Sequence, residues 1–239
     1  MDKNILLEEL FELDSNTNNK KFVTVREKMV DYLKTHDEIL ISNAICFIDA
    51  VLGYLNKSDD EGAYKICQPI FIRLVDKKRW DFYDICLIAP FCSGADNYEE
   101  AYLLTREALY HLENFKDEPG YKKLRWVVCT NLCIRLVKAK YLDKHYDKQH
   151  EEIELLFSHY IETSFAYCKD FEDKRLDARA FIYKGIFYGD ANFIDRGMKI
   201  FKYLKDETSY ELYNKEVEKY LAYKHGEARN RREQIYLIK

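Results

Sequence analysis

Apolar side chains recur three and four positions apart along almost the whole chain, and the strict alternation typical of a half-buried strand is absent. Residues Phe22, Val25 and Met29 form one such stripe. The chain also contains only 8 glycines and 3 prolines, whereas sheet proteins need turn residues about every 8–12 positions. Helices joined by short polar turns tolerate this composition. The pattern therefore predicts an all-α protein.

Polar breaks divide the sequence into about ten or eleven helices joined by short turns. Short connections make consecutive helices antiparallel, and antiparallel pairs that recur about every 35–45 residues are typical of helical-repeat arrays. No strict sequence period is present, although residues 98–101 (YEEA) and 106–109 (REAL) are similar to fragments of tetratricopeptide repeats. We predict a single domain over residues 1–222, folded as a degenerate tetratricopeptide-like superhelix, a right-handed array of antiparallel helix pairs; an irregular bundle is the alternative. The predicted pairs are 22–56, 60–92, 98–140, 151–189 and 191–222.

Charge is distributed unevenly along the chain. The sequence has 38 basic and 42 acidic residues, a formal net charge of −4, so its total charge gives no support for a nucleic-acid-binding surface, which is usually basic. Residues 223–239 form a locally basic C-terminal tail that includes Arg229, Arg231 and Arg232. These arginines could contact phosphates or belong to a solvated chain end. We expect no direct binding of nucleic acid by this chain.

Cysteine usage and the first residues indicate a cytoplasmic protein. The 7 cysteines are odd in number and form no CxxC motif, which favours reduced thiols packed as small apolar groups. The acidic residues Asp2, Glu8 and Glu9 argue against a signal segment. The longest apolar stretch, residues 39–55, contains Asp49 and predicts a buried helix rather than a membrane span. We therefore expect a cytoplasmic chain without membrane contact.

Motifs of enzymatic chemistry are missing from the sequence. It contains no GxxxxGK[ST] or GxGxxG phosphate-binding loop, no HExxH and no GxSxG. Cys129 and Cys133 share one helix face, but a zinc site needs about four ligands and no second pair stands out. We therefore expect no catalytic residues, no metal, no cofactor and no enzymatic activity.

A polar stripe on the helix predicted around residues 121–140 is the main candidate binding site. Asn131, Arg135 and Lys138 are spaced four and three positions apart and share a face. An asparagine amide both donates and accepts hydrogen bonds, and an arginine can clamp a carboxylate with two of them. These are the groups that hold an extended peptide in a groove. The alternative is that the stripe is only the solvated side of its helix.

Further polar residues at helical spacing extend this candidate peptide site. Arg175, Arg179 and Tyr183 follow one another at four-residue steps, and Arg73 lies near the end of the helix that contains Pro69. Aromatic residues make up 15% of the chain and include 20 tyrosines, which supply amphipathic contact area at recognition surfaces. From this stripe and its neighbours we predict that Asn131, Arg135, Lys138, Arg179, Tyr183 and Arg73 bind a peptide or a partner protein.

The segment Trp80-Asp81-Phe82-Tyr83-Asp84 resembles the Rgg/GadR/MutR family of Gram-positive regulators, whose regulatory domains typically show a Trp, a Tyr three positions later and then an acidic residue. Trp80, Tyr83 and Asp84 match this pattern, with Asp in place of the usual Glu. The resemblance adds Tyr83 to the candidate site and covers about residues 20–222. It is also carried by the stretches 131–132, 183–185, 197–201 and 211–213.

The resemblance implies a homodimeric helical-repeat domain for transcription regulation and quorum sensing, which senses a short intracellular peptide in a concave groove. Members of the family carry a helix-turn-helix before this domain. Here only one short helix fits before the break at residues 16–19, which is too little for a DNA-reading module. The chain is then either a natural regulator without that module or a fragment. The alternative function is a protein–protein adaptor that needs no peptide ligand.

Overall fold

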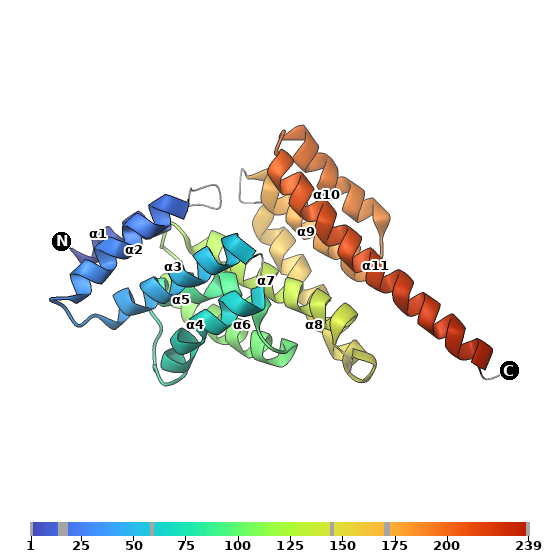
Figure 1. Cartoon of the computed structure of the whole chain (residues 1–239), viewed down its shortest axis with the longest axis horizontal. Coiled ribbons are helices and arrows are strands. Elements are labelled where there is room, and N and C mark those ends of the chain that lie inside the picture. Colours follow the sequence, from blue (N-terminus) through green and yellow to red (C-terminus); the bar gives the residue numbers. More distant parts are fainter. Residues whose placement is uncertain (1, 14–18, 58–59, 144–145, 170–172, 238–239) are drawn as a thin grey trace. The chain divides into compact units, whose positions relative to one another are not determined.

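The computed structural model of the chain describes residues 2–13, 19–57, 60–143, 146–169 and 173–237, and the side chains at 57, 60 and 224–237 are not described. Within these ranges every regular element is a helix and no strand is present (Figure 1). The prediction of an all-α protein is therefore confirmed. The α-helices are α1 (Lys3–Phe11), α2 (Asn19–Leu33), α3 (Ile39–Lys57), α4 (Asp60–Val75), α5 (Phe82–Ile88), α6 (Tyr98–Leu112), α7 (Tyr121–Leu142), α8 (Tyr146–Cys168), α9 (Lys174–Tyr188), α10 (Ala191–Tyr203) and α11 (Glu207–Leu237), with short 3-10 helices η1 (Ala89–Gly94) and η2 (Glu113–Phe115).

Two prolines lie within or directly after helices of the chain. Pro69 lies inside α4, which continues through it as one helix. Helix α5 gives way at Ala89 to the 3-10 helix η1, where Pro90 occupies an early position and removes one N–H donor. At the C-terminal end, the backbone of α11 stays helical to Leu237. The predicted role of the basic tail depends on side chains of residues 224–239, which lie outside the described residues.

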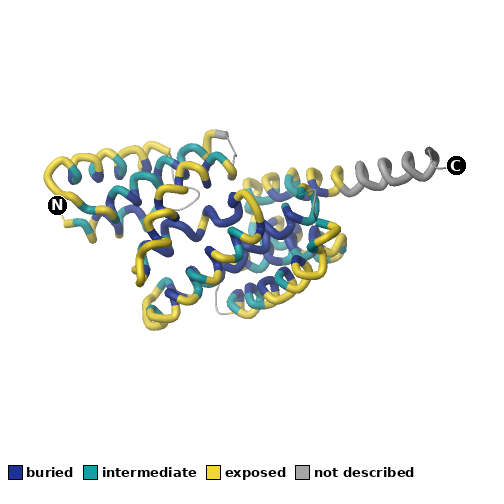
Figure 2. Tube along the Cα trace, turned by 90° about the horizontal axis from the view of Figure 1, so that it is seen from below, coloured by how far each residue is buried: buried dark blue, intermediate teal, exposed yellow. Residues whose placement is uncertain are grey.

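The chain packs as two compact units, Met1–Asn131 and Leu132–Lys239, here called the N-terminal unit and the C-terminal unit. Helix α7 contributes residues to both units. Most helices bury one side and expose the other (Figure 2), whereas every residue of α7 from Val128 to Val137 is buried. The predicted single domain over residues 1–222 stays a prediction.

Helix α3 lies at the centre of the packing between α2 and α4 in the N-terminal unit. Its residues Ile41, Ala44 and Ile48 are fully buried and pack with leucines of α1 and with Phe22 and Met29 of α2. Beside this buried face, Asp49 of the same helix accepts two hydrogen bonds from the Arg26 guanidinium of α2, at 2.6 and 3.1 Å. This pair fixes α2 against α3 at the edge of the apolar core.

Within the described part of the chain, one window of α3, Ile39–Asn56, has the length and apolar composition of a membrane-crossing helix, and 28% of it is buried. Core helices of water-soluble proteins pass the same test. The helix packs on both sides against neighbours of the N-terminal unit. The expected cytoplasmic location stays a prediction.

Two glycines allow α9 and α10 to approach each other closely in the C-terminal unit. A Cβ atom at Gly197 would lie 2.6 Å from the carbonyl oxygen of Ala178, and one at Gly185 would lie 2.7 Å from the backbone nitrogen of Ile194. The turn between the helices is closed by Gly189, which ends α9 at φ 67°, a left-handed conformation that glycine adopts without penalty.

We expect Gly197→Ala to destabilise the C-terminal unit by about 1–3 kcal/mol, because the new methyl group meets a backbone carbonyl that cannot rotate away. Thermal unfolding followed by circular dichroism measures the change. The matched control is Gly53→Ala in α3, where the new methyl meets only the flexible end of Ile66 at 3.3 Å and alanine favours the helix. Equal melting temperatures for the two variants would contradict the close approach.

Candidate functional site

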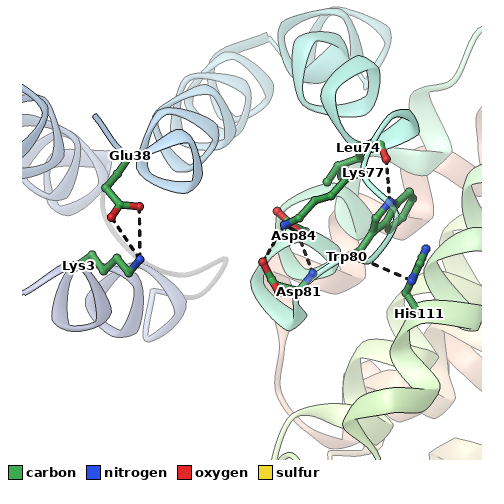
Figure 3. Close-up of polar contacts among 8 residues, drawn as sticks. All are labelled: Lys3, Glu38, Leu74, Lys77, Trp80, Asp81, Asp84 and His111. Atoms are coloured by element: carbon green, nitrogen blue, oxygen red, sulfur yellow. Dashed lines mark hydrogen bonds and ion pairs between the residues drawn. The ribbon is translucent and has the colours of Figure 1, made fainter. Parts of the chain in front are cut away.

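The motif at residues 80–84 forms the start of α5 (Figure 3). The backbone N–H of Asp81 donates to the Asp84 carboxylate at 2.8 Å, which satisfies one donor at the helix N-terminus. Lys77 Nζ contacts both Asp81 and Asp84. Asp84 is almost fully buried, and a buried carboxylate is tolerated because these donors surround it. The acidic residue of the motif therefore caps a helix.

Trp80, which precedes α5, joins α4 to α6 in the N-terminal unit (Figure 3). Its indole Nε1 donates to the carbonyl of Leu74 in α4 at 2.9 Å, and its ring stacks on His111 of α6 with 5.1 Å between centroids. The backbone N–H of Trp80 donates to His111 Nδ1 at 3.5 Å, so that this ring nitrogen acts as an acceptor. Burial lowers the pKa of His111, and the neutral ring fits this contact.

Tyr83 is half-buried in the core of the N-terminal unit rather than displayed on its surface. Its ring stacks on Phe11 of α1 with 5.6 Å between centroids and an angle of 15°. Burial raises the pKa of its hydroxyl, and the nearby carboxylate of Glu8 acts in the same direction. Tyr83, one of the seven candidate residues, therefore packs α5 against α1.

Asn131 is only 7% exposed. Its amide Nδ2 donates to the carbonyl of Ala89 at 2.8 Å, at the junction where α5 gives way to η1. This carbonyl precedes Pro90, and the bond ties α7 to that junction within the N-terminal unit. The asparagine donor predicted to read a peptide is therefore engaged inside the chain.

Arg135 is 4% exposed and belongs to the C-terminal unit. Its guanidinium donates to Asp143, directly after α7, at 3.1 Å. Lys138, the third residue of the stripe, is half-buried on the same helix. The alternative interpretation of the stripe as a solvated helix face does not fit Asn131 or Arg135, since both are buried.

Tyr183 and Arg179 lie one turn apart on α9. The Tyr183 hydroxyl donates to Glu216 of α11 at 2.9 Å, and only 3% of the residue is exposed. Burial raises the pKa of Tyr183 well above its ordinary value, Glu216 raises it further, and the positive charge of Arg179 opposes them. The bond between Tyr183 and Glu216 joins α9 to α11. Arg73, on α4 of the N-terminal unit, is exposed.

Cysteine and acidic side chains offer no site for a metal among the described residues, where no group of three or more His, Cys, Asp or Glu is arranged to hold an ion. All seven cysteines are free thiols. Burial raises the pKa of Cys129 to about 12 and also raises that of Cys67, which keeps these thiols protonated and weakly nucleophilic at neutral pH.

An open groove on α9 and α10 was missed by the sequence analysis. Its volume is about 430 Å³, and it brings together three cations, one carboxylate and two apolar side chains. Its residues on α10 recur three and four positions apart, but so do those of any exposed helix face. The lining residues are Lys174, Asp195, Arg196, Lys199, Ile200 and Tyr203.

Comparisons of the chain with protein-family models, with curated proteins and with solved structures give no match. The amide of Asn131 and the guanidinium of Arg135 hold parts of the fold together, while the exposed cations of Arg73 and of the α9–α10 groove can reach a ligand.

We expect Asn131→Ala to destabilise the N-terminal unit by about 1–3 kcal/mol, because it leaves the buried carbonyl of Ala89 without this donor. Urea unfolding followed by tryptophan fluorescence measures the change, since both tryptophans, Trp80 and Trp126, belong to this unit. The control is Arg73→Ala, an exposed site where the change should stay within about 0.5 kcal/mol. If Asn131→Ala leaves the free energy of unfolding unchanged, the hydrogen bond to Ala89 is not structural and Asn131 remains a candidate for ligand binding.

We expect acid to destabilise the N-terminal unit through His111. The pKa of His111 is lowered by burial in the folded state, whereas the unfolded chain has the ordinary value of about 6.5. The unfolded state then binds more protons, so the stability present above about pH 6.5 falls as the pH drops towards the folded pKa, by at most about 1.4 kcal/mol per pH unit. Urea unfolding with tryptophan fluorescence at a series of pH values measures this slope.

The His111→Gln variant should lack this part of the pH dependence, because it has no ring to protonate beside Trp80. The control is His159→Gln, which removes an exposed histidine of α8 in the C-terminal unit. If the two variants keep the same pH slope as the original chain, proton binding at His111 does not control the stability of this unit.

Proposed function

We propose that the chain is a tetratricopeptide-like helical-repeat array that serves as the peptide-binding regulatory module of an Rgg-type transcriptional regulator. The supporting observation is that, within each unit, helices pack mainly against their neighbours in sequence. In the N-terminal unit α1 packs on α2, α2 on α3 and α3 on α4; in the C-terminal unit α8 packs on α9, α9 on α10 and α10 on α11. Repeat arrays have this nearly one-dimensional pattern of contacts.

A peptide fits such an array because consecutive helices expose parallel rows of side chains. An extended peptide has backbone N–H and C=O groups that need partners once they leave water. On α7, the half-buried Lys138 follows Asn131 and Arg135 on one face and is the member of the stripe with the most access to solvent. We propose that Lys138 contacts the peptide, and that the buried Asn131 and Arg135 hold α7 in place.

The proposal includes a cytoplasmic homodimer that responds to a short hydrophobic peptide in quorum sensing. Free thiols with a raised pKa, such as Cys92 and Cys129, suit a reducing compartment.

One observation favours the second candidate function, a protein–protein adaptor without a peptide ligand. The Asn131 amide and the Arg135 guanidinium, the two groups best suited to a peptide backbone, form hydrogen bonds inside the chain. An adaptor needs no such groups, because a folded partner has its own backbone hydrogen bonds. Arg73 and other exposed side chains would then make the contacts.

We expect calorimetry of the purified chain to detect binding of short hydrophobic peptides encoded in the same genome. Lys138→Ala should weaken this binding about tenfold or more, the loss expected for one charge-assisted contact. The control is Arg106→Ala, since Arg106 is an exposed residue of α6 that pairs only with its neighbour Glu107 among the contacts described. Binding that is equal in both variants would exclude Lys138 from the site.

The same purified chain separates the two candidate functions. Light scattering reports whether it is a homodimer, and a pull-down reports whether one large protein binds it without added peptide. Peptide binding together with a dimer supports the regulatory module. A stable complex with a large partner and no response to any peptide supports the adaptor and contradicts the first proposal.

A further inference from the structure

The groove on α9 and α10 combines positive charge with aromatic surface. Its cations are Lys174, Arg196 and Lys199, and its only carboxylate is Asp195, so the lining carries a formal charge of +2. The chain as a whole carries −4. A concave positive site on an acidic chain attracts anions locally, because charges in a concave site focus the field there.

Arg196 is the most distinctive cation of this groove. Its guanidinium carbon lies 4.0 Å from the centroid of the Phe181 ring on α9. No ion pair or hydrogen bond of this guanidinium occurs within the described part of the chain. The ring holds the guanidinium by a cation–π contact, and the N–H groups at the guanidinium edge stay available for a ligand.

Phe181 is itself held by its neighbours. It packs against Phe165 of α8 with 4.8 Å between centroids and against Phe193 of α10 at 6.2 Å. The ammonium of Lys184 lies over both outer rings, at 5.3 and 5.0 Å. Three consecutive helices thus build a cation–aromatic surface next to the groove, and Arg196 belongs to both.

The other two cations are weakly engaged. Lys174 pairs with Asp177 and Lys199 pairs with Asp195, each within one turn of the same helix. Both lysines and Asp195 are largely exposed, and pairs of this kind contribute little to stability. A ligand carboxylate can therefore replace these partners at small cost.

Apolar side chains complete the groove. Tyr203 is 86% exposed at one end of it, and Ile200 is half-buried beside it. An exposed aromatic ring next to cations is an unusual surface, and rings of this kind are enriched where proteins bind other proteins. The lining therefore suits a ligand that carries a carboxylate next to an aromatic or aliphatic side chain.

We infer that the α9–α10 groove binds an acidic peptide segment of a partner protein, with a carboxylate held by Arg196 and Lys199 and an adjacent apolar side chain packed on Tyr203 and Ile200. Charge complementarity selects this occupant. The inference does not depend on the proposed function, because the groove shares no residue with the stripe on α7.

Fluorescence anisotropy with the whole chain tests this inference. The probe is a fluorescein-labelled peptide of sequence EDFELD, and the matched peptides are QNFQLN, which lacks the charges, and EDAEAD, which lacks the apolar side chains. We expect EDFELD to bind, and we expect the affinity of each matched peptide to be lower by a factor of about ten or more. Binding should also weaken as salt is added, because the carboxylate contacts are screened.

Two groove variants should change the affinity in opposite directions. Arg196→Gln should weaken EDFELD binding about fivefold or more, and Asp195→Asn should strengthen it about twofold or more, because it removes the one carboxylate that competes for Lys199. The control is Lys215→Gln on α11, an exposed lysine outside the groove, which should leave the affinity unchanged. Circular dichroism checks that all three variants remain folded.

Several results would overturn the inference. They are no binding of EDFELD, equal binding of EDFELD and EDAEAD, equal losses in Arg196→Gln and Lys215→Gln, or weaker binding in Asp195→Asn. Tighter binding of single-stranded DNA than of EDFELD, lost in Arg196→Gln, would assign the groove to nucleic acid instead. None of these results would change the expected calorimetry with hydrophobic peptides and Lys138→Ala. The proposal for the groove and the proposed function are therefore tested independently.

Discussion

The close approach of α9 and α10 determines the groove of the C-terminal unit. Backbone atoms of one helix occupy the space that a side chain would need at Gly185 or Gly197 of the other. The short distance between the helix axes brings Lys174 of α9 beside Arg196 of α10, so that side chains from two helices line one groove. It also brings the ring of Phe181 under the guanidinium of Arg196. With bulkier residues at the two glycine positions, the helices would separate and these contacts would be lost.

In the N-terminal unit, polar side chains rather than glycines hold α4, α5 and α6 together. Trp80 reaches a carbonyl of α4 and the ring of His111 in α6, and Asp84 caps α5 while it pairs with Lys77. A helix end has backbone groups without partners, and burying such an end is favourable only if side chains supply them. The residues that resemble a regulator motif therefore have a sufficient structural reason to be present, whatever ligand the chain binds.

The helices could be predicted from the sequence, and the environment of the stripe could not. Apolar periodicity within one segment decides whether that segment is a helix, so the pair boundaries predicted at residues 56 and 191 lie within one residue of the end of α3 (Lys57) and the start of α10 (Ala191). Burial of Asn131 depends instead on a carbonyl of Ala89, 42 positions away, and burial of Arg135 depends on what covers α7. The groove was missed for the same reason, because its lining comes from two helices and depends on their distance apart.

Some polar side chains form hydrogen bonds inside the chain and others are exposed, and this difference affects which ligands they can bind. Asn131, Arg135 and Tyr183 have the chemistry to bind a peptide backbone, yet each forms a hydrogen bond within its own unit. A ligand that used them would first have to break those bonds, and the cost of exposing the former partners would reduce its affinity. Arg196 has no such bond among the described contacts and is already oriented by an aromatic ring. An accessible cation that is already oriented, such as Arg196, can bind a carboxylate without that cost, whereas Asn131, Arg135 and Tyr183 cannot bind a main chain without it.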